Sequence, residues 1–255
     1  GLGDVYKRQA IFYLNRTHAV VRISISRLKF DRAIFRQSLR IGLPSGFQQT
    51  FVSLGLIAIV WIVNLFGTDV IAAFSIAMRI DSLASMAAMN FAAALATFVG
   101  QNLGANKPER VRSGLVATFV MTSVISVIIT IIALLFSRNL MGVFTDDLNV
   151  IDLGAKYLVI VSSFDILFST MFVLNGVMRG AGDTLIPMFI TLVALWFVRI
   201  PLSYFLSEKI GETGIWWAIP MGWFLGMLLS YFYYLTGRWK IKAVVRYDQK
   251  GVVSD

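Results

Sequence analysis

Residues 113–137 read SGLVATFVMTSVISVIITIIALLFS, and this stretch contains no Asp, Glu, Lys or Arg. Two further stretches, residues 82–106 and residues 213–237, are equally free of these charged residues. A membrane-spanning helix needs about 20 apolar residues, so each stretch is long enough to cross a bilayer. Because lipid offers the backbone no hydrogen-bond partners, such runs must form helices. The sequence therefore predicts a helical membrane protein.

The composition of the whole chain agrees with this prediction. Of its 255 residues, 57% are hydrophobic and only 15% are charged, which is less charge than a soluble domain of this length carries. The six predicted spans are Leu43–Phe66, Val70–Gly100, Val111–Phe136, Val150–Met178, Thr184–Ser207 and Gly214–Thr236. The predicted fold class is an all-α membrane protein with six transmembrane helices.

The formal net charge of +9 is concentrated in alternate loops. The basic loops contain Arg16, Arg22, Arg27, Lys29, Arg32, Arg36, Arg40, Lys107, Arg110, Arg112, Arg179, Arg238, Lys240, Lys242, Arg246 and Lys250. The opposite loops contain Arg138, Lys156 and Lys209 beside Asp69, Asp146, Asp147, Asp152, Glu208 and Glu212. The positive-inside rule then predicts both ends on the cytoplasmic side of a bacterial or archaeal cytoplasmic membrane. The basic charge is an orientation signal with some attraction to anionic membrane lipid, and nucleic-acid binding is a poor alternative.

Residue types that support catalysis or metal binding are scarce. The chain has no Cys, and its single His18 lies in a basic loop, so neither a thiolate site nor a histidine metal site is expected. The spans contain no Ser–His, Asp–Asp or metal-ligand arrangement, which argues against an intramembrane enzyme. No cofactor is predicted.

Asp165 lies deep in the fourth predicted span. At 1.5 Å per residue it is about 14 Å along the helix from Lys156 and about 21 Å from Arg179. A carboxylate near the middle of the membrane is costly and is a functional candidate by default, and a proton and a cation could compete for it. The structural alternative is a buried Asp that bonds to Ser162, Ser163 or a neighbouring helix.

Amide and ionisable side chains occur in other spans. The candidates for a polar cavity and for ion coupling are Asp165, Gln48, Gln49 and Asn90. The amides among them could equally bond across helices. Arg79 and Asp81 are two residues apart, or about 200° of rotation on a helix, so each needs a partner elsewhere. We assign them, with Arg199, to a structural network between helices.

Two loops carry glycine-rich motifs, GQNLGANKPERVR at residues 100–112 and MRGAGDTLIP at residues 178–187. The loop residues of interest are Gly100, Gln101, Asn102, Gly104, Arg179, Gly180, Gly182 and Asp183. Gly104 is expected to adopt the left-handed conformation that ends a helix. Gly180 and Gly182 are expected to stop one helix, and Asp183 or Thr184 to cap the next. The second motif is not a phosphate loop, because it follows a helix and lacks a third glycine.

Five segments in the same order resemble the carboxy-terminal half of a multidrug and toxic compound extrusion (MATE) transporter. They are IGLPSGFQQTFVSLG (41–55), AMRIDSL (77–83), TFVGQNLGANKPERVR (97–112), VLNGVMRGAGDTLIPM (173–188) and WFVRIPLSYFL (196–206). The resemblance implies twelve helices in two pseudo-symmetric lobes, of which this chain is one. It also implies secondary active antiport by alternating access, with organic cations or other amphipathic drugs exported against H⁺ or Na⁺. The amino-terminal lobe would then be a partner.

The opening GLGDVYKRQ has no initiator Met and looks like a translated sequencing adapter. We therefore expect residues 1–9 to be an artefact and residues 10–40 to be the end of a preceding helix with a basic inter-lobe linker. Residues 41–237 would be the six-helix lobe, and residues 238–255 a basic cytoplasmic tail. On this interpretation the amino-terminal lobe is missing from the chain.

The chain departs from the family in one respect. Some MATE proteins have an acidic pair in this half, and the corresponding positions here are Val52 and Phe168, while Asp165 lies one helical turn earlier. That ion site does not transfer residue by residue, so the choice between H⁺ and Na⁺ stays open. Two alternatives to a drug antiporter are a lipid-linked saccharide flippase of a related superfamily and a non-transporting membrane scaffold.

Overall fold

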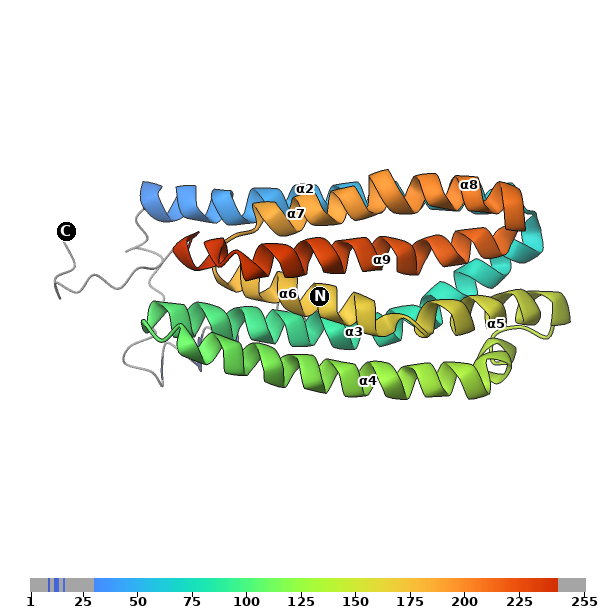
Figure 1. Cartoon of the computed structure of the whole chain (residues 1–255), viewed down its shortest axis with the longest axis horizontal. Coiled ribbons are helices and arrows are strands. Elements are labelled where there is room, and N and C mark those ends of the chain that lie inside the picture. Colours follow the sequence, from blue (N-terminus) through green and yellow to red (C-terminus); the bar gives the residue numbers. More distant parts are fainter. Residues whose placement is uncertain (1–8, 10–11, 14–15, 17–29, 243–255) are drawn as a thin grey trace. The chain divides into compact units, whose positions relative to one another are not determined.

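The computed structural model describes residues 9, 12–13, 16 and 30–242 (Figure 1). Predictions that fall outside these residues are the adapter artefact apart from Gln9, most of the linker with His18, and the tail after Lys242. The chain divides into two compact units, residues 1–39 and residues 40–255, and each is described by itself.

Every element in the described part of the chain is a helix. The α-helices are α2 (Arg32–Asn64), α3 (Thr68–Gly104), α4 (Glu109–Gly142), α5 (Leu148–Ser162), α6 (Asp165–Gly180), α7 (Leu185–Leu192), α8 (Ile200–Ile210) and α9 (Glu212–Leu235). A π-helix, η2 (Val193–Arg199), joins α7 to α8, and a 3₁₀ helix, η3 (Arg238–Lys242), follows α9. Five helical segments are long and apolar enough to cross a membrane, or six if α5 and α6 form one bent span. The predicted all-α membrane fold is therefore confirmed.

In the first unit, Asp31 starts helix α2. Its Oδ1 accepts hydrogen bonds from the backbone N–H groups of Ala33 at 2.7 Å and Ile34 at 3.0 Å. These bonds satisfy two of the donors that the first turn of any helix leaves unpaired. Within the same unit, the Arg16 guanidinium lies 5.1 Å from the centre of the Phe12 ring.

Helix α6 lies between its neighbours in the second unit, where it contacts α3, α4 and α9, while α9 also packs on α8 and η2 (Figure 1). The contact of α6 with α3 depends on two glycines. A Cβ at Gly176 would lie 2.6 Å from the carbonyl oxygen of Ala92, and one at Gly180 would meet the carbonyl oxygen of Ala96. Small residues let helix backbones approach closely in lipid, which supports a packing role for this pair.

Three aromatic residues join α3, α5 and α9 in the main apolar core. The Phe74 ring stacks on Trp216 with centroids 5.5 Å apart, and Tyr157 meets Trp216 edge-on at 5.1 Å. Phe74, Tyr157 and Trp216 are all buried.

The connections between helices lie at two ends of the second unit. Figure 1 shows the connections after α3 and α6 and the end of α9 at one end, and those after α2, α4 and α8 at the other. The first end contains the basic residues of 107–112, Arg179 and 238–242. The alternation of basic and other loops along the sequence is thus a separation in space.

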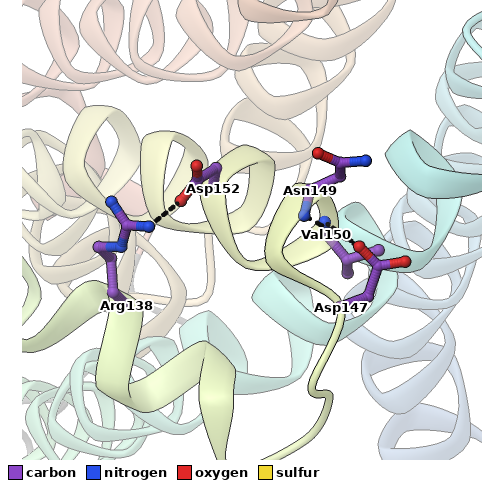
Figure 2. A network of polar contacts seen from close by, with 5 residues as sticks. All are labelled: Arg138, Asp147, Asn149, Val150 and Asp152. Carbon is purple, nitrogen blue, oxygen red and sulfur yellow. Dashed lines mark hydrogen bonds and ion pairs between the residues drawn. The ribbon is translucent and has the colours of Figure 1, made fainter.

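The α4–α5 corner belongs to the second of these ends (Figure 1), and Figure 2 shows its polar contacts from close by. Arg138 on α4 forms an ion pair with Asp152 on α5 at 2.7 Å, and both side chains are exposed. Asp147 caps α5, since its Oδ1 accepts from the N–H groups of Asn149 at 2.9 Å and Val150 at 3.4 Å. An exposed ion pair of this kind stabilises the fold by only about 0.2–1 kcal/mol.

Two predictions about local structure are wrong. The fourth predicted span is not one helix, because the chain breaks at Ser163–Phe164 and α6 continues at 49° to α5. Gly104 remains in α3, and Asn106 takes the left-handed conformation with φ of 55°. The predicted turn at Gly182 is confirmed, since its φ is 84°.

Candidate functional site

A partly open cavity of about 140 Å³, called the larger cavity below, lies between α2, α6, η2 and α9. Its lining is mainly apolar and aromatic and includes Val52, Phe168, Met171, Phe172 and Trp223. Among the described residues that line it, Arg199 is the charged one and Thr191 contributes a hydroxyl. Aromatic and Met side chains adapt to varied hydrophobic molecules, so the cavity is suited to an amphipathic small molecule.

The larger cavity brings together the two positions at which the resemblance places an acidic pair. Val52 on α2 and Phe168 on α6 both line it, although they are far apart in sequence. Both side chains are apolar here, so the larger cavity contains no carboxylate from these positions. Any carboxylate that this lobe contributes must act from elsewhere.

Asp165 lies against a second, smaller cavity between α3, α4 and α6, which has about 10 Å³ of free space for water-sized molecules. The side chain is 5% exposed, and its Oδ2 has no hydrogen-bond partner among the described residues. Asp165 is the first residue of α6, directly after the break, where the positive end of the helix dipole favours a carboxylate. A buried carboxylate oxygen without a partner is costly, so this position invites a ligand.

The polar side chains around the smaller cavity all present oxygen atoms. They belong to Ser85, Thr122, Ser126, Asp165 and Ser169. The hydroxyls of Ser126 on α4 and Ser169 on α6 are hydrogen-bonded to each other at 2.7 Å. Sequence reasoning missed this pair. The spacing of four between Asp165 and Ser169 places them on one helix face, but nothing in the sequence points to Ser126.

One bonding partner expected for Asp165 in the structural alternative, the Ser163 hydroxyl, is engaged elsewhere. The Ser163 hydroxyl donates to the Val159 carbonyl at 2.6 Å, and the Ser162 carbonyl accepts from the Thr130 hydroxyl at 2.6 Å. These bonds stabilise the residues at the helix break, and neither of them involves the Asp165 carboxylate.

Asp81 and Arg199 are brought close enough for their charges to interact, with Tyr157 beside them. Each retains a buried polar atom without a hydrogen bond to any described residue, Oδ1 of Asp81 and Nε of Arg199. The network between helices stays a prediction, and Arg79 is exposed.

Gln48 bonds across helices. Its Nε2 donates to the Thr191 hydroxyl at 2.7 Å, and its Oε1 accepts from the Arg179 guanidinium at 2.9 Å. These bonds tie α2 to α6 and α7, so the amide is engaged in a link between helices. Gln49 and Asn90 are exposed and line neither cavity, and their part in the mechanism stays a prediction.

The two loop motifs meet at the basic end of the second unit. A Cβ at Gly100 would lie 3.3 Å from the carbonyl oxygen of Gly180, so the glycines bring the loops together. The Asn102 side chain is buried and donates to the Phe98 carbonyl at 2.8 Å, whereas Gln101 is exposed. Buried Asp183 accepts a hydrogen bond from the Tyr233 hydroxyl on α9.

The hydrophobic spans and the cavity between helices define a class, that of multi-pass helical membrane proteins with room for a ligand between their helices. The MatE family model matches residues 44–205, which is more than half of the chain. The chain belongs to the MatE family, whose members are transporters and not enzymes.

Relatives named as multidrug resistance proteins support this membership. The chain is 30% identical over 231 residues to a probable multidrug resistance protein, YpnP, of Bacillus subtilis, covering 90% of this chain and 51% of YpnP. It is 26% identical over 212 residues to the probable multidrug resistance protein NorM of Thermotoga maritima, covering 82% of this chain and 46% of NorM. The chain thus spans about half the length of the relatives it matches.

Solved structures share the fold. An outward-facing multidrug resistance MATE transporter of the MOP superfamily superposes with a TM-score of 0.84 at 19% identity, over 94% of this chain and 55% of that one. A crystal structure of a MATE protein in the bent conformation gives a TM-score of 0.81 at 21% identity, over 95% of this chain and 54% of that one. This chain therefore has the fold of about half of a MATE transporter.

Proposed function

We propose that this chain is one lobe of a secondary active antiporter that exports organic cations or drugs by alternating access. The observation that carries the proposal is the MatE match over residues 44–205 together with relatives called multidrug resistance proteins. The aromatic and Met-lined larger cavity supports it, because aromatic faces attract cations and bind apolar groups. Export is coupled to H⁺ or Na⁺. The intact transporter is this lobe with a second, amino-terminal lobe.

In this proposal the protein lies in the cytoplasmic membrane with lipid around it and both ends in the cytoplasm. The separation of basic from other connections between the two ends of the second unit supports that orientation. Asp165 is the candidate coupling carboxylate of this lobe.

Export of a fluorescent organic cation from cells that express the intact transporter tests the proposal. We expect Phe168→Ala to weaken export, because Phe168 lines the larger cavity. Phe205→Ala is the matched control, since Phe205 is exposed on α8 and should leave export unchanged. If the intact wild-type protein is expressed and exports no organic cation, the proposal is wrong.

A further inference from the structure

We propose that a groove between α4 and α5 binds an anionic phospholipid, whose phosphate contacts Lys156 and Arg138 and whose acyl chain lies along Val159 and Ile160. The groove has a volume of about 450 Å³ and is open to the surface. It shares no lining residue with the two cavities described above. Binding of such a lipid does not depend on the proposed antiport and can be measured without transport.

One face of α5 changes from charged to apolar along the groove. Asp152, Lys156, Val159 and Ile160 all line it, and they follow the spacing i, i+4, i+7 and i+8 that places side chains on one side of a helix. Lys156 is about 6 Å along the helix from Asp152, and the apolar pair follows on the next turn. The groove therefore has a charged end for a headgroup and an apolar end for a hydrocarbon chain.

The charged end lies where lipid headgroups are expected. The charge-free stretch of α4 ends at Ser137, and Arg138 is the first charged residue beyond it. Charged side chains at the ends of membrane helices reach the interface, and a long Lys side chain that starts deeper extends to the same level. Val159 and Ile160 lie further along α5 from this end, at the depth of the acyl chains.

The net charge of the groove fits one phosphate group. Figure 2 shows the ion pair between Arg138 and Asp152, with a distance of 2.7 Å. Lys156 is exposed and forms no ion pair with any described residue. The two positive charges and the one negative charge sum to +1, which balances the single negative charge of phosphatidylglycerol. Ammonium and guanidinium groups both donate strong hydrogen bonds to phosphate oxygens.

The groove gathers basic residues at the end of the second unit where they are scarce. Of the three basic residues that the sequence assigns to the non-basic connections, Arg138 and Lys156 line the groove, whereas Lys209 on α8 does not. A free phosphate ion would use only the charged end of the groove. The apolar continuation along α5 therefore favours a lipid as the occupant.

Photochemical cross-linking to the purified intact transporter in detergent tests the inference. The probe is phosphatidylglycerol with a diazirine in its acyl chain, and cross-linked residues are located by peptide mass spectrometry. We expect cross-links at Val159 or Ile160 that unlabelled phosphatidylglycerol competes away about fivefold better than phosphatidylcholine, which carries no net charge. Inorganic phosphate at the same concentration should not compete, because it lacks the acyl chain.

Three variants change the charge of this end by one unit each. Lys156→Gln should weaken competition by phosphatidylglycerol about fivefold, because a basic residue near anionic lipid contributes roughly that factor. Asp152→Asn should strengthen it about twofold to fivefold, since it leaves Arg138 unpaired and raises the net charge. Lys209→Gln is the matched control and should match wild type, because Lys209 lies outside the groove.

Thermal unfolding of each purified variant checks that it folds. A general effect of protein stability would not shift lipid binding in opposite directions in Lys156→Gln and Asp152→Asn. Several results would overturn the inference: wild-type protein without competed cross-links in the groove, as expected if a second lobe covers it; equal competition by phosphatidylcholine or inorganic phosphate; or wild-type binding in a folded Lys156→Gln protein.

Discussion

At Asp165, a carboxylate that is only 5% exposed lies at the start of α6 with one oxygen unpaired, beside two hydroxyls bonded to each other. At Gln48, by contrast, both ends of an amide are used to join three helices. Both residues were candidates for the same cavity on sequence grounds. Their hydrogen bonds indicate different roles, because the bonded Gln48 amide stabilises the fold while the unpaired oxygen of Asp165 is available to a ligand.

Replacing Asp165 by Asn in the intact transporter should reduce export of an organic cation by about tenfold or more, while expression stays normal. The amide keeps the size and hydrogen-bonding capacity of the side chain but removes its charge. The measurement is the initial rate of efflux of a fluorescent cation per amount of protein in the membrane. Wild-type efflux at normal expression would remove Asp165 from the mechanism, and loss of folded protein would assign it a structural role.

The adjacent amides Gln48 and Gln49 form a matched pair for a stability test. Gln48→Ala removes two hydrogen bonds between helices and should lower the free energy of unfolding by about 1 kcal/mol. Gln49→Ala changes an exposed side chain and should have almost no effect. Thermal unfolding of the purified variants measures the difference. Equal melting temperatures would show that the Gln48 bonds contribute nothing.

At the scale of helices, the sequence predicted the spans well and their interruptions poorly. Charge-free runs such as residues 113–137 strongly indicate membrane-spanning helices, because a helix satisfies its own backbone hydrogen bonds within the bilayer. The break after Ser162 has no Pro or Gly to mark it, and the Ser162 carbonyl is bonded by Thr130 from another helix. The seven-residue π-helix η2 ends just before Pro201, which lacks a backbone N–H, but the sequence did not predict its extent.

The crossing of α3 and α6 gives a second stability test. Gly176→Ala would place a Cβ 2.6 Å from the Ala92 carbonyl oxygen and should destabilise the lobe by about 1–3 kcal/mol. Gly46→Ala on α2 meets nothing within 4 Å in the described residues and should be neutral or stabilise by up to about 1 kcal/mol. The readout is the unfolding midpoint of each purified variant. A Gly176→Ala protein as stable as wild type would contradict the close packing.

At the scale of the whole molecule, the family, the class of fold and the separation of basic from other loops followed from sequence patterns and are supported by the match and the structure. The candidate site was harder to predict. The sequence singled out Asp165, but the meeting of Asp165, Ser126 and Ser169 depends on how α4 and α6 pack, and no local pattern encodes that.

The orientation of the lobe in the membrane can be tested with single cysteines, since the chain has no native Cys. Asp147→Cys and Asn106→Cys lie in connections at opposite ends of the second unit. A membrane-impermeant thiol reagent applied outside intact cells should label the first and spare the second, because basic loops stay in the cytoplasm. Labelling at Asn106 alone would reverse the proposed topology.

Transport driven by an imposed ion gradient tests ion-coupled export most directly. The intact transporter is reconstituted in proteoliposomes, and uphill movement of an organic cation is followed under a sodium gradient at equal pH and, separately, under a pH gradient at equal sodium. We predict accumulation of the cation under one of the two gradients by wild-type protein and by Asp152→Asn, and its loss in Asp165→Asn. Absence of accumulation under both gradients in the wild type, or its persistence in Asp165→Asn, would contradict coupling through this carboxylate.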